Sequence, residues 1–141
     1  MSKVTTPYDE LTYKIIGIAM TVHNELGPGL NEEMYKKAMS ILLDEQEIVY
    51  SREFAIPINF RNRLLGTFKL DFIVNQKVIV EVKAVSSFAP IHEQQLLTYL
   101  TASGLPVGLL INFGASSLQH KRLFPPNAVQ SSPIYKSRQP K

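Results

Sequence analysis

The chain has 141 residues, of which 45% are hydrophobic and 19% are charged. This composition suits one globular domain that buries roughly two-thirds of the surface its unfolded form exposes. The absence of cysteine excludes a disulfide framework and a thiolate metal site. No apolar run approaches the roughly 18 residues of a membrane span, and the opening MSKVTTPYDE lacks the apolar region of a signal peptide. We therefore expect a soluble, cytoplasmic protein without a membrane partner.

The net charge of +3 is unevenly distributed. Residues 1–118 carry ten lysines and arginines against twelve acids, whereas residues 119–141 carry five cations and no acid. We expect a single domain over residues 1–126 and a basic, flexible tail over residues 127–141. Such a tail can gain affinity for phosphate backbones through counterion release, or it can be a solvated terminus that keeps the chain soluble. The sequence leaves both interpretations open.

Two helices are predicted first. Thr6 is a candidate N-cap with Pro7 at the first helical position, and apolar residues then recur at helical spacing as far as Leu26. The segment GPG that follows ends this helix. Asn31 is the candidate cap of a second helix, whose apolar stripe runs to about Glu47.

After the second helix the period changes to two, which is typical of strands. The segment VYSREFAIPINF (49–60) alternates in part, and NRLLG (62–66) offers a turn. Two further β-rich segments, TFKLDFIV (67–74) and VIVEVK (78–83), follow. The pattern predicts a meander of three strands.

The last third of the chain predicts one helix and one or two strands. Pro90 opens a helix that runs to about Ser103, and Gly104 is its candidate C-cap. PVGLLINF (106–113) has the pattern of a buried strand reached by a crossover connection, and residues 118–124 are a candidate edge strand. The order ααβββαβ(β) predicts an α/β domain with a mixed central β-sheet flanked by helices.

Three charges interrupt the most apolar part of this pattern. Glu81 and Lys83 lie on one face of their strand because side chains alternate across a sheet. The position of Asp71 depends on the turn that precedes Val78. A three-residue loop at 75–77 sets Asp71 directly opposite Glu81, whereas a two-residue loop sends it to the other face.

If the two carboxylates meet, they lie about 5 Å apart and repel each other unless they share a proton or bind a cation. With no cysteine and no histidine pair at ligand spacing, such a site favours Mg²⁺ or Mn²⁺ over Zn²⁺. Mg²⁺ keeps several waters, and one of them near the Lys83 ammonium is a candidate nucleophile for phosphodiester hydrolysis. The alternative is a solvated Glu81–Lys83 salt bridge, with Asp71 as an edge-strand charge that discourages aggregation.

Several ordered motifs resemble those of the GxxExxY proteins, which are grouped with the PD-(D/E)XK nuclease-like superfamily. They are GLNEEMY, with Gly29, Glu32 and Tyr35; LDFIV, with Asp71; and VEVKAV, with Glu81 and Lys83. The likeness covers about Leu11 to Phe124. It implies a restriction-endonuclease-like core, in agreement with the predicted element order.

The resemblance also implies roles for these residues. Asp71 and Glu81 would ligate a divalent metal, Mg²⁺ or Mn²⁺, together with the backbone carbonyl of Val82. Lys83 would orient or activate the attacking water. Glu32 would reach the metal through water, although an acid at a helix start is also favoured by the helix dipole.

The helix predicted from Pro90 places His92, Gln95 and Tyr99 on one face. Gln95 and Tyr99 resemble a Gln-x-x-x-Tyr element that in this superfamily borders the metal site and the DNA. His92 fits a structural role better than a site role.

Two functions remain open. The first is a Mg²⁺-dependent nuclease that hydrolyses phosphodiester bonds of DNA, with RNA as the second choice of substrate. The second is a catalytically idle protein that kept the nuclease fold as a nucleic-acid-binding or protein-interaction module. The small body, without an appended recognition domain, favours the second function or an enzyme that relies on a homodimer or a partner protein.

Overall fold

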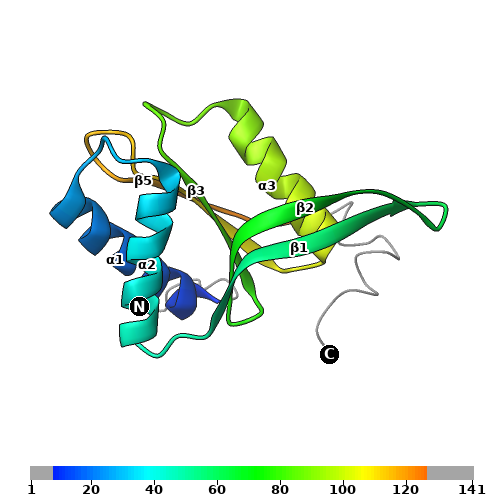
Figure 1. Ribbon diagram of the computed structural model, residues 1–141, viewed down its shortest axis with the longest axis horizontal. Helices are drawn as coiled ribbons and strands as arrows, with labels where there is room; N and C mark the ends of the chain where they lie inside the picture. The colour runs from blue at the N-terminus through cyan, green and yellow to red at the C-terminus, as the bar shows by residue number, and fades with distance from the viewer. Residues whose placement is uncertain (1–7, 127–141) are drawn as a thin grey trace, which may run out of the picture.

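The computed structural model describes residues 8–126 (Figure 1). Its elements, in chain order, are α1 (Asp9–Leu26), α2 (Glu32–Glu45), β1 (Tyr50–Phe60), β2 (Arg63–Val74), β3 (Val78–Lys83), α3 (Pro90–Ser103), β4 (Val107–Asn112) and β5 (Gln119–Leu123). The predicted cap Thr6, the predicted start at Pro7 and the predicted tail at 127–141 all lie outside the described residues. No helix within residues 8–126 is long and apolar enough to cross a membrane.

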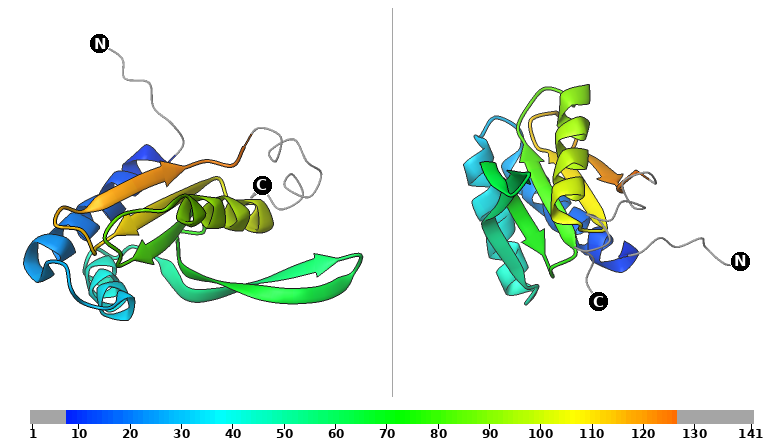
Figure 2. Two further views of the ribbon diagram at one scale, coloured as in Figure 1. Left: turned by 90° about the horizontal axis from the view of Figure 1, so that it is seen from above. Right: turned by 90° about the vertical axis from the view of Figure 1, so that its right-hand side faces the viewer.

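The five strands form one mixed sheet in the order β1-β2-β3-β4-β5. The meander β1–β2–β3 is antiparallel, β3 pairs with β4 in parallel, and β5 returns antiparallel to β4. Helix α3 makes the crossover between the two parallel strands. Helices α1 and α2 cover one face of the sheet and α3 covers the other (Figure 2). The predicted mixed sheet flanked by helices is confirmed.

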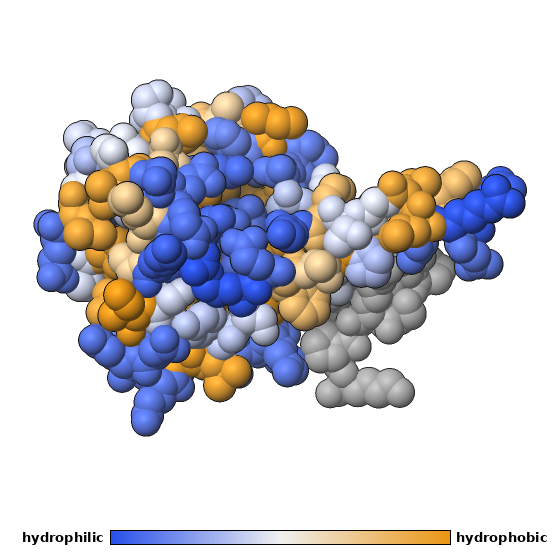
Figure 3. All heavy atoms as spheres, viewed as in Figure 1, coloured by the Kyte–Doolittle hydropathy of each residue, from blue (hydrophilic) through white to orange (hydrophobic). Residues whose placement is uncertain are grey.

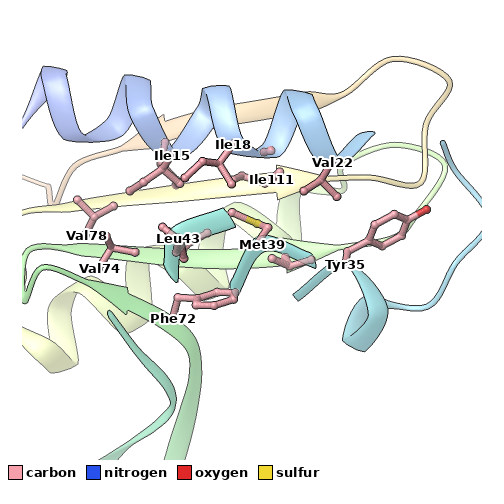
Figure 4. Packing of buried hydrophobic residues seen from close by; sticks show 14 of the residues in the cluster. Ile15, Ile18, Val22, Tyr35, Met39, Leu43, Phe72, Val74, Val78 and Ile111 are labelled. Atoms are coloured by element: carbon pink, nitrogen blue, oxygen red, sulfur yellow. The ribbon is translucent and has the colours of Figure 1, made fainter. Parts of the chain in front are cut away.

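The larger core lies between the α1–α2 pair and the sheet (Figure 4). The β3 side chains Val78, Val80 and Val82 face it because they alternate with the residues directed at α3. Tyr35 of α2 is fully buried in this core and stacks on Phe113 with 4.5 Å between ring centroids.

The tyrosine of the GxxExxY-like segment also orders the connection between α1 and α2. The Tyr35 hydroxyl donates to the Gly27 carbonyl and accepts a hydrogen bond from the Leu30 N–H at 3.1 Å. Asn31 accepts from the Met34 N–H at 2.9 Å, as its predicted role as N-cap requires. The start of α2 is thereby fixed relative to the sheet.

The predicted turn at 62–66 is wrong. The chain turns at Arg61 and Asn62, which have φ of 48° and 65°, and β2 already begins at Arg63. Asparagine tolerates the left-handed conformation better than most residues, so a two-residue turn forms and the rest of NRLLG extends the strand. The result is a long hairpin that projects from the body (Figure 1). The second helix also ends earlier than predicted, at Glu45.

Candidate active site

The candidate site forms where β2 separates from β3. Val74 pairs with Val78 and Phe72 with Val80, which requires the three-residue loop at 75–77. Beyond these pairs the contacts between the strands involve side chains. The Asp71 N–H donates to Glu81 Oε1 at 3.1 Å, and the Val82 N–H donates to Asp71 Oδ2 at 2.8 Å. Of the two loops considered from the sequence, the structure has the three-residue one, and this register brings the two carboxyl groups together.

The separation coincides with an irregularity in the neighbouring strand. Arg52 pairs with Phe72 and Phe54 with Leu70, but Glu53 between them has φ of 53° and the pairing is interrupted there. A left-handed residue in a strand changes its direction. The β1–β2 hairpin therefore leaves the sheet at Asp71, and the Asp71 carboxylate fills the gap between β2 and β3.

Glu81 is the buried acid of the site. Only 5% of its surface is exposed. Burial, and secondly the negative charge of Asp71, raise the pKa of Glu81 to about 8. Two adjacent carboxyl groups, one of which resists ionisation, are suited to binding a divalent cation. Such an ion would offset the repulsion between the two carboxylates and the cost of removing them from water.

Lys36 of α2 supplies a positive charge at the same place. Its Nζ lies 2.8 Å from Asp71 Oδ1 and 3.8 Å from Glu53 Oε1. The side chains of Lys36 and Asp71 are 12% and 13% exposed, so the pair is largely out of water. Burial by itself would lower the pKa of Lys36, but the hydrogen bond and charge of Asp71 outweigh it and the pKa is raised.

Sequence reasoning missed Lys36. One signal was available, since Lys36 follows Glu32 by four positions and so lies on the same face of α2. Glu32 itself is half-buried at the first position of the helix, and its charge also contributes to the raised pKa of Lys36. Within residues 8–126, no three acidic or histidine side chains cluster as a ready metal site, so Glu32 does not join Asp71 and Glu81 in direct ligand geometry.

Lys83 and Gln95 meet on the α3 side of the sheet. The Lys83 Nζ donates to Gln95 Oε1 at 3.2 Å. Tyr99, one turn further along α3, is buried, and its ring centroid lies 5.0 Å from that of Phe68. Burial and then the charges of Glu81 and Asp71 raise the pKa of Tyr99.

His92 lies apart from this group. Its Nδ1 accepts a hydrogen bond from the Ala89 N–H at 3.1 Å, at the start of α3. It therefore closes the first turn of the helix, in line with the structural role expected for it.

The chain after Lys83 is held by the buried side chain of Asn112. Its Oδ1 accepts from the Val85 N–H at 2.9 Å and its Nδ2 donates to the Val85 carbonyl at 2.8 Å. The Phe113 N–H donates to the Lys83 carbonyl at 2.9 Å. Both backbone groups of Val85 are thus satisfied, and the end of β3 that carries Lys83 is fixed to β4.

Several solved structures share this fold, including the following three. The crystal structure of SSO0001 has a TM-score of 0.54 at 16% sequence identity. The matched region covers 74% of the present chain and 54% of SSO0001. The alkaline exonuclease LHK-Exo from Laribacter hongkongensis has a TM-score of 0.51 at 11% identity, covering 95% of this chain and 78% of that one. Its complex with dAMP has a TM-score of 0.52 at 10% identity, with coverage of 94% and 77%.

Comparison with curated proteins gave no match. A family model described as the PD-(D/E)XK nuclease superfamily matches residues 9–123, a range that includes Asp71, Glu81, Lys83 and Gln95. The match covers most of the chain, and the fold and element order agree with it. The chain belongs to the PD-(D/E)XK nuclease superfamily.

Proposed function

We propose that the protein is a metal-dependent nuclease that hydrolyses phosphodiester bonds of DNA. One observation carries the proposal: the Asp71 and Glu81 carboxyl groups meet where β2 leaves β3, and Lys83 lies on the same face of β3 as Glu81. A protein that only binds nucleic acid gains nothing from two carboxyl groups that repel each other and the phosphates. Membership in a nuclease superfamily supports the same conclusion.

The donor set favours Mg²⁺ or Mn²⁺. Asp71, Glu81 and the backbone carbonyl of Val82 would hold the ion, and Glu32 would reach it through water. All of these donors are hard oxygens, which suit these two ions. When bound, the ion would supply positive charge to the phosphodiester oxygens as negative charge develops on them.

The remaining residues act on the substrate and the water. The Lys83 ammonium would orient the attacking water and neutralise its developing charge, while the hydrogen bond to Gln95 holds the ammonium toward α3. Tyr99 would close the apolar side of the site, where its ring packs against Phe68. Water exclusion on that side strengthens the electrostatic interactions within the site.

Two substitutions test the division of roles. Asp71→Ala should lose both metal binding and cleavage. Lys83→Ala should keep metal binding within a few-fold and lose cleavage by about 10²–10⁴-fold, the range for loss of a positioned proton-transfer or charge-stabilising group. Calorimetric titration with Mg²⁺ and Mn²⁺ measures the first property. Cleavage of single-stranded, duplex and branched DNA and of RNA measures the second.

Lys14→Ala is the matched control, because Lys14 is an exposed lysine of α1 whose ion pair within residues 8–126 is with Glu10 at 3.8 Å. It should leave both measurements unchanged. Cleavage that survives in both Asp71→Ala and Lys83→Ala would assign the activity to another site or a contaminant. Nucleic-acid binding without any cleavage would favour the binding-module alternative, for which the neutralisation of Asp71 by Lys36 is the supporting observation.

A further inference from the structure

Residues 54–70 of the β1–β2 hairpin form an arm whose outer part extends beyond the body (Figures 1 and 2). It starts at the irregularity between Glu53 and Asp71, and every residue from Asn59 to Thr67 is exposed. Both faces of this part of the ribbon are therefore free of the core. A two-stranded ribbon has little stability of its own in water, so an arm of this length is expected to serve a contact.

The arm carries a net positive charge. Arg61, Arg63 and Lys69 lie within it, and no acid occurs in the sequence between Glu53 and Asp71. None of the ion pairs found within residues 8–126 uses these three cations. Their charges are thus available to a polyanion.

The tip of the arm adds apolar groups to these cations. Phe60, Leu64 and Leu65 are 59%, 64% and 68% exposed. The Arg61 guanidinium lies 5.5 Å from the centroid of the Phe60 ring, so a cation and an aromatic face occur together at the turn. In Figure 3 hydrophobic and hydrophilic atoms adjoin along the projecting end.

We propose that the arm enters the major groove of duplex DNA and makes DNA, in preference to duplex RNA, the substrate of the site. This inference rests on the proposed nuclease function. The major groove of B-DNA, about 12 Å wide, admits a two-stranded β-ribbon. The deep, narrow major groove of A-form RNA does not.

Each group at the tip has a partner in that groove. Arg61 and Arg63 contact phosphates or guanine edges, and the Phe60 ring contacts thymine methyl groups. A second copy of the chain could also cover the apolar side chains of the tip. In such a dimer, however, the cations of one arm would face the cations of the other, with no acid between them. Charge complementarity therefore favours DNA.

The arm also sets where the duplex lies relative to the site. A strand rises about 3.3 Å per residue, so the eight residues from Arg63 to Asp71 span roughly 26 Å, which is less than one turn of B-DNA. A groove of about 380 Å³ lies between the arm and α3, lined by Ile58 and Phe68 on one side and Thr98 and Thr101 on the other. The arm thus holds DNA within one helical turn of Asp71 and Glu81.

The test compares Arg61→Gln/Arg63→Gln with the wild type in metal-free buffer, so that binding is measured without cleavage. The probes are a DNA duplex of about two helical turns and an RNA duplex of the same sequence. Their binding is measured by fluorescence anisotropy between 50 and 200 mM salt. We expect the wild type to prefer DNA. The double variant should lose about tenfold or more in affinity for DNA, its salt slope should fall by about 2, and its affinity for RNA should stay unchanged.

The matched control is Lys14→Gln/Lys77→Gln, which removes the same charge from the body, away from the arm. Equal losses in the control and the arm variant would overturn the proposal, because the effect would then follow from net charge alone. Phe60→Ser should also weaken DNA binding without changing the salt slope. All these positions are exposed or half-buried, so unchanged melting temperatures would confirm intact folding.

Three further outcomes are decisive. A wild-type dimer that Leu64→Ser/Leu65→Ser dissociates with DNA affinity unchanged, seen by sedimentation, would assign the arm to a second copy instead. If the arm variant binds DNA like the wild type while wild-type cleavage of DNA depends on Asp71, the arm proposal fails and the nuclease function stands. A wild type that neither binds nor cleaves any nucleic acid overturns both.

Discussion

Glu81 occupies a position that disfavours its own charge. Its pKa is raised from 4.5 to about 8 by burial and by Asp71, although Lys83 and Lys36 act in the opposite direction. Between these two values the folded protein holds a proton that the unfolded chain has released. The free energy of unfolding must therefore decrease as the pH rises through this range.

In the metal-free wild type, the contribution of Glu81 to stability should be fully present below about pH 4.5. This contribution should be lost as the pH rises from there to about pH 8. The slope can reach about 1.4 kcal/mol per pH unit for one group. Glu81→Gln, which keeps the shape of the neutral acid, should remove this loss and be the more stable protein at pH 9. Urea unfolding across pH in EDTA measures the difference, and coincident curves for the two proteins would contradict the raised pKa.

Lys36 occupies the cation position on Asp71, so it should compete with a metal there. Lys36→Met should tighten Mn²⁺ binding, because the competing ammonium is gone. It should also destabilise the metal-free protein by about 3 kcal/mol, because the Asp71 carboxylate loses its buried partner. Calorimetric titration and urea unfolding measure the two effects.

The control for Lys36 is its neighbour on α2, Lys37, which is exposed. Lys37→Met should change neither the metal affinity nor the stability by more than about 0.5 kcal/mol. Weaker Mn²⁺ binding by Lys36→Met would contradict the competition and indicate that Lys36 helps to organise the site.

The elements differ in how much of them local sequence determines. The cap at Asn31, the end of α3 at Gly104 and the buried strand β4 depend on nearby residues, and each was predictable. The loop at 75–77 was one of two alternatives, and pairing of the hydrophobic residues on both sides selected it. With the loop settled, the register directs Asp71 toward Glu81, and side-chain hydrogen bonds complete their contact where the two strands separate.

Other features depend on contacts between distant elements. The separation of β2 from β3 requires a left-handed Glu53, and no local pattern in SREFA predicts one. The Lys36–Asp71 pair joins α2 to β2, so it follows only from the packing of the helix on the sheet. The site residues expected by resemblance were therefore accessible to sequence reasoning, whereas the cation that neutralises one of them was not.

Asn112 links two elements and its removal should be costly. Asn112→Ala leaves the N–H and carbonyl of the half-buried Val85 without their partner, and the cost of a fully buried unsatisfied group, about 1–3 kcal/mol, is an upper bound for each. We expect a stability loss of about 2–4 kcal/mol in urea unfolding, and a fall in any cleavage because Lys83 lies just before the freed segment. Asn59→Ala, at an exposed position of the arm, is the control and should change stability little. A loss below 0.5 kcal/mol, the size of an ordinary surface substitution, would show that water replaces Asn112.

The basic residues near the C-terminus are divided between the folded body and the final segment differently from what the sequence suggested. Lys121 and Arg122 belong to β5 and pair with Glu93 and Asp9, so they are part of the folded body. Residues 127–141 still carry Lys136, Arg138 and Lys141 without an acid. We propose that the domain ends at residue 126 and that this basic segment serves nucleic-acid affinity only.

Removal of residues 127–141 tests that division of labour. The truncated protein should melt at the temperature of the full chain and bind Mn²⁺ equally well, because the proposed site lies wholly within residues 32–99. Its affinity for duplex DNA should fall, and the slope of log affinity against log salt should fall by up to about 2.7, since each cation at a phosphate contributes about 0.9. The control keeps the length and changes Lys136, Arg138 and Lys141 to glutamine, which should reproduce the full effect if charge is the cause. A truncated protein that unfolds at lower temperature, while the glutamine variant does not, would instead make the segment part of the domain.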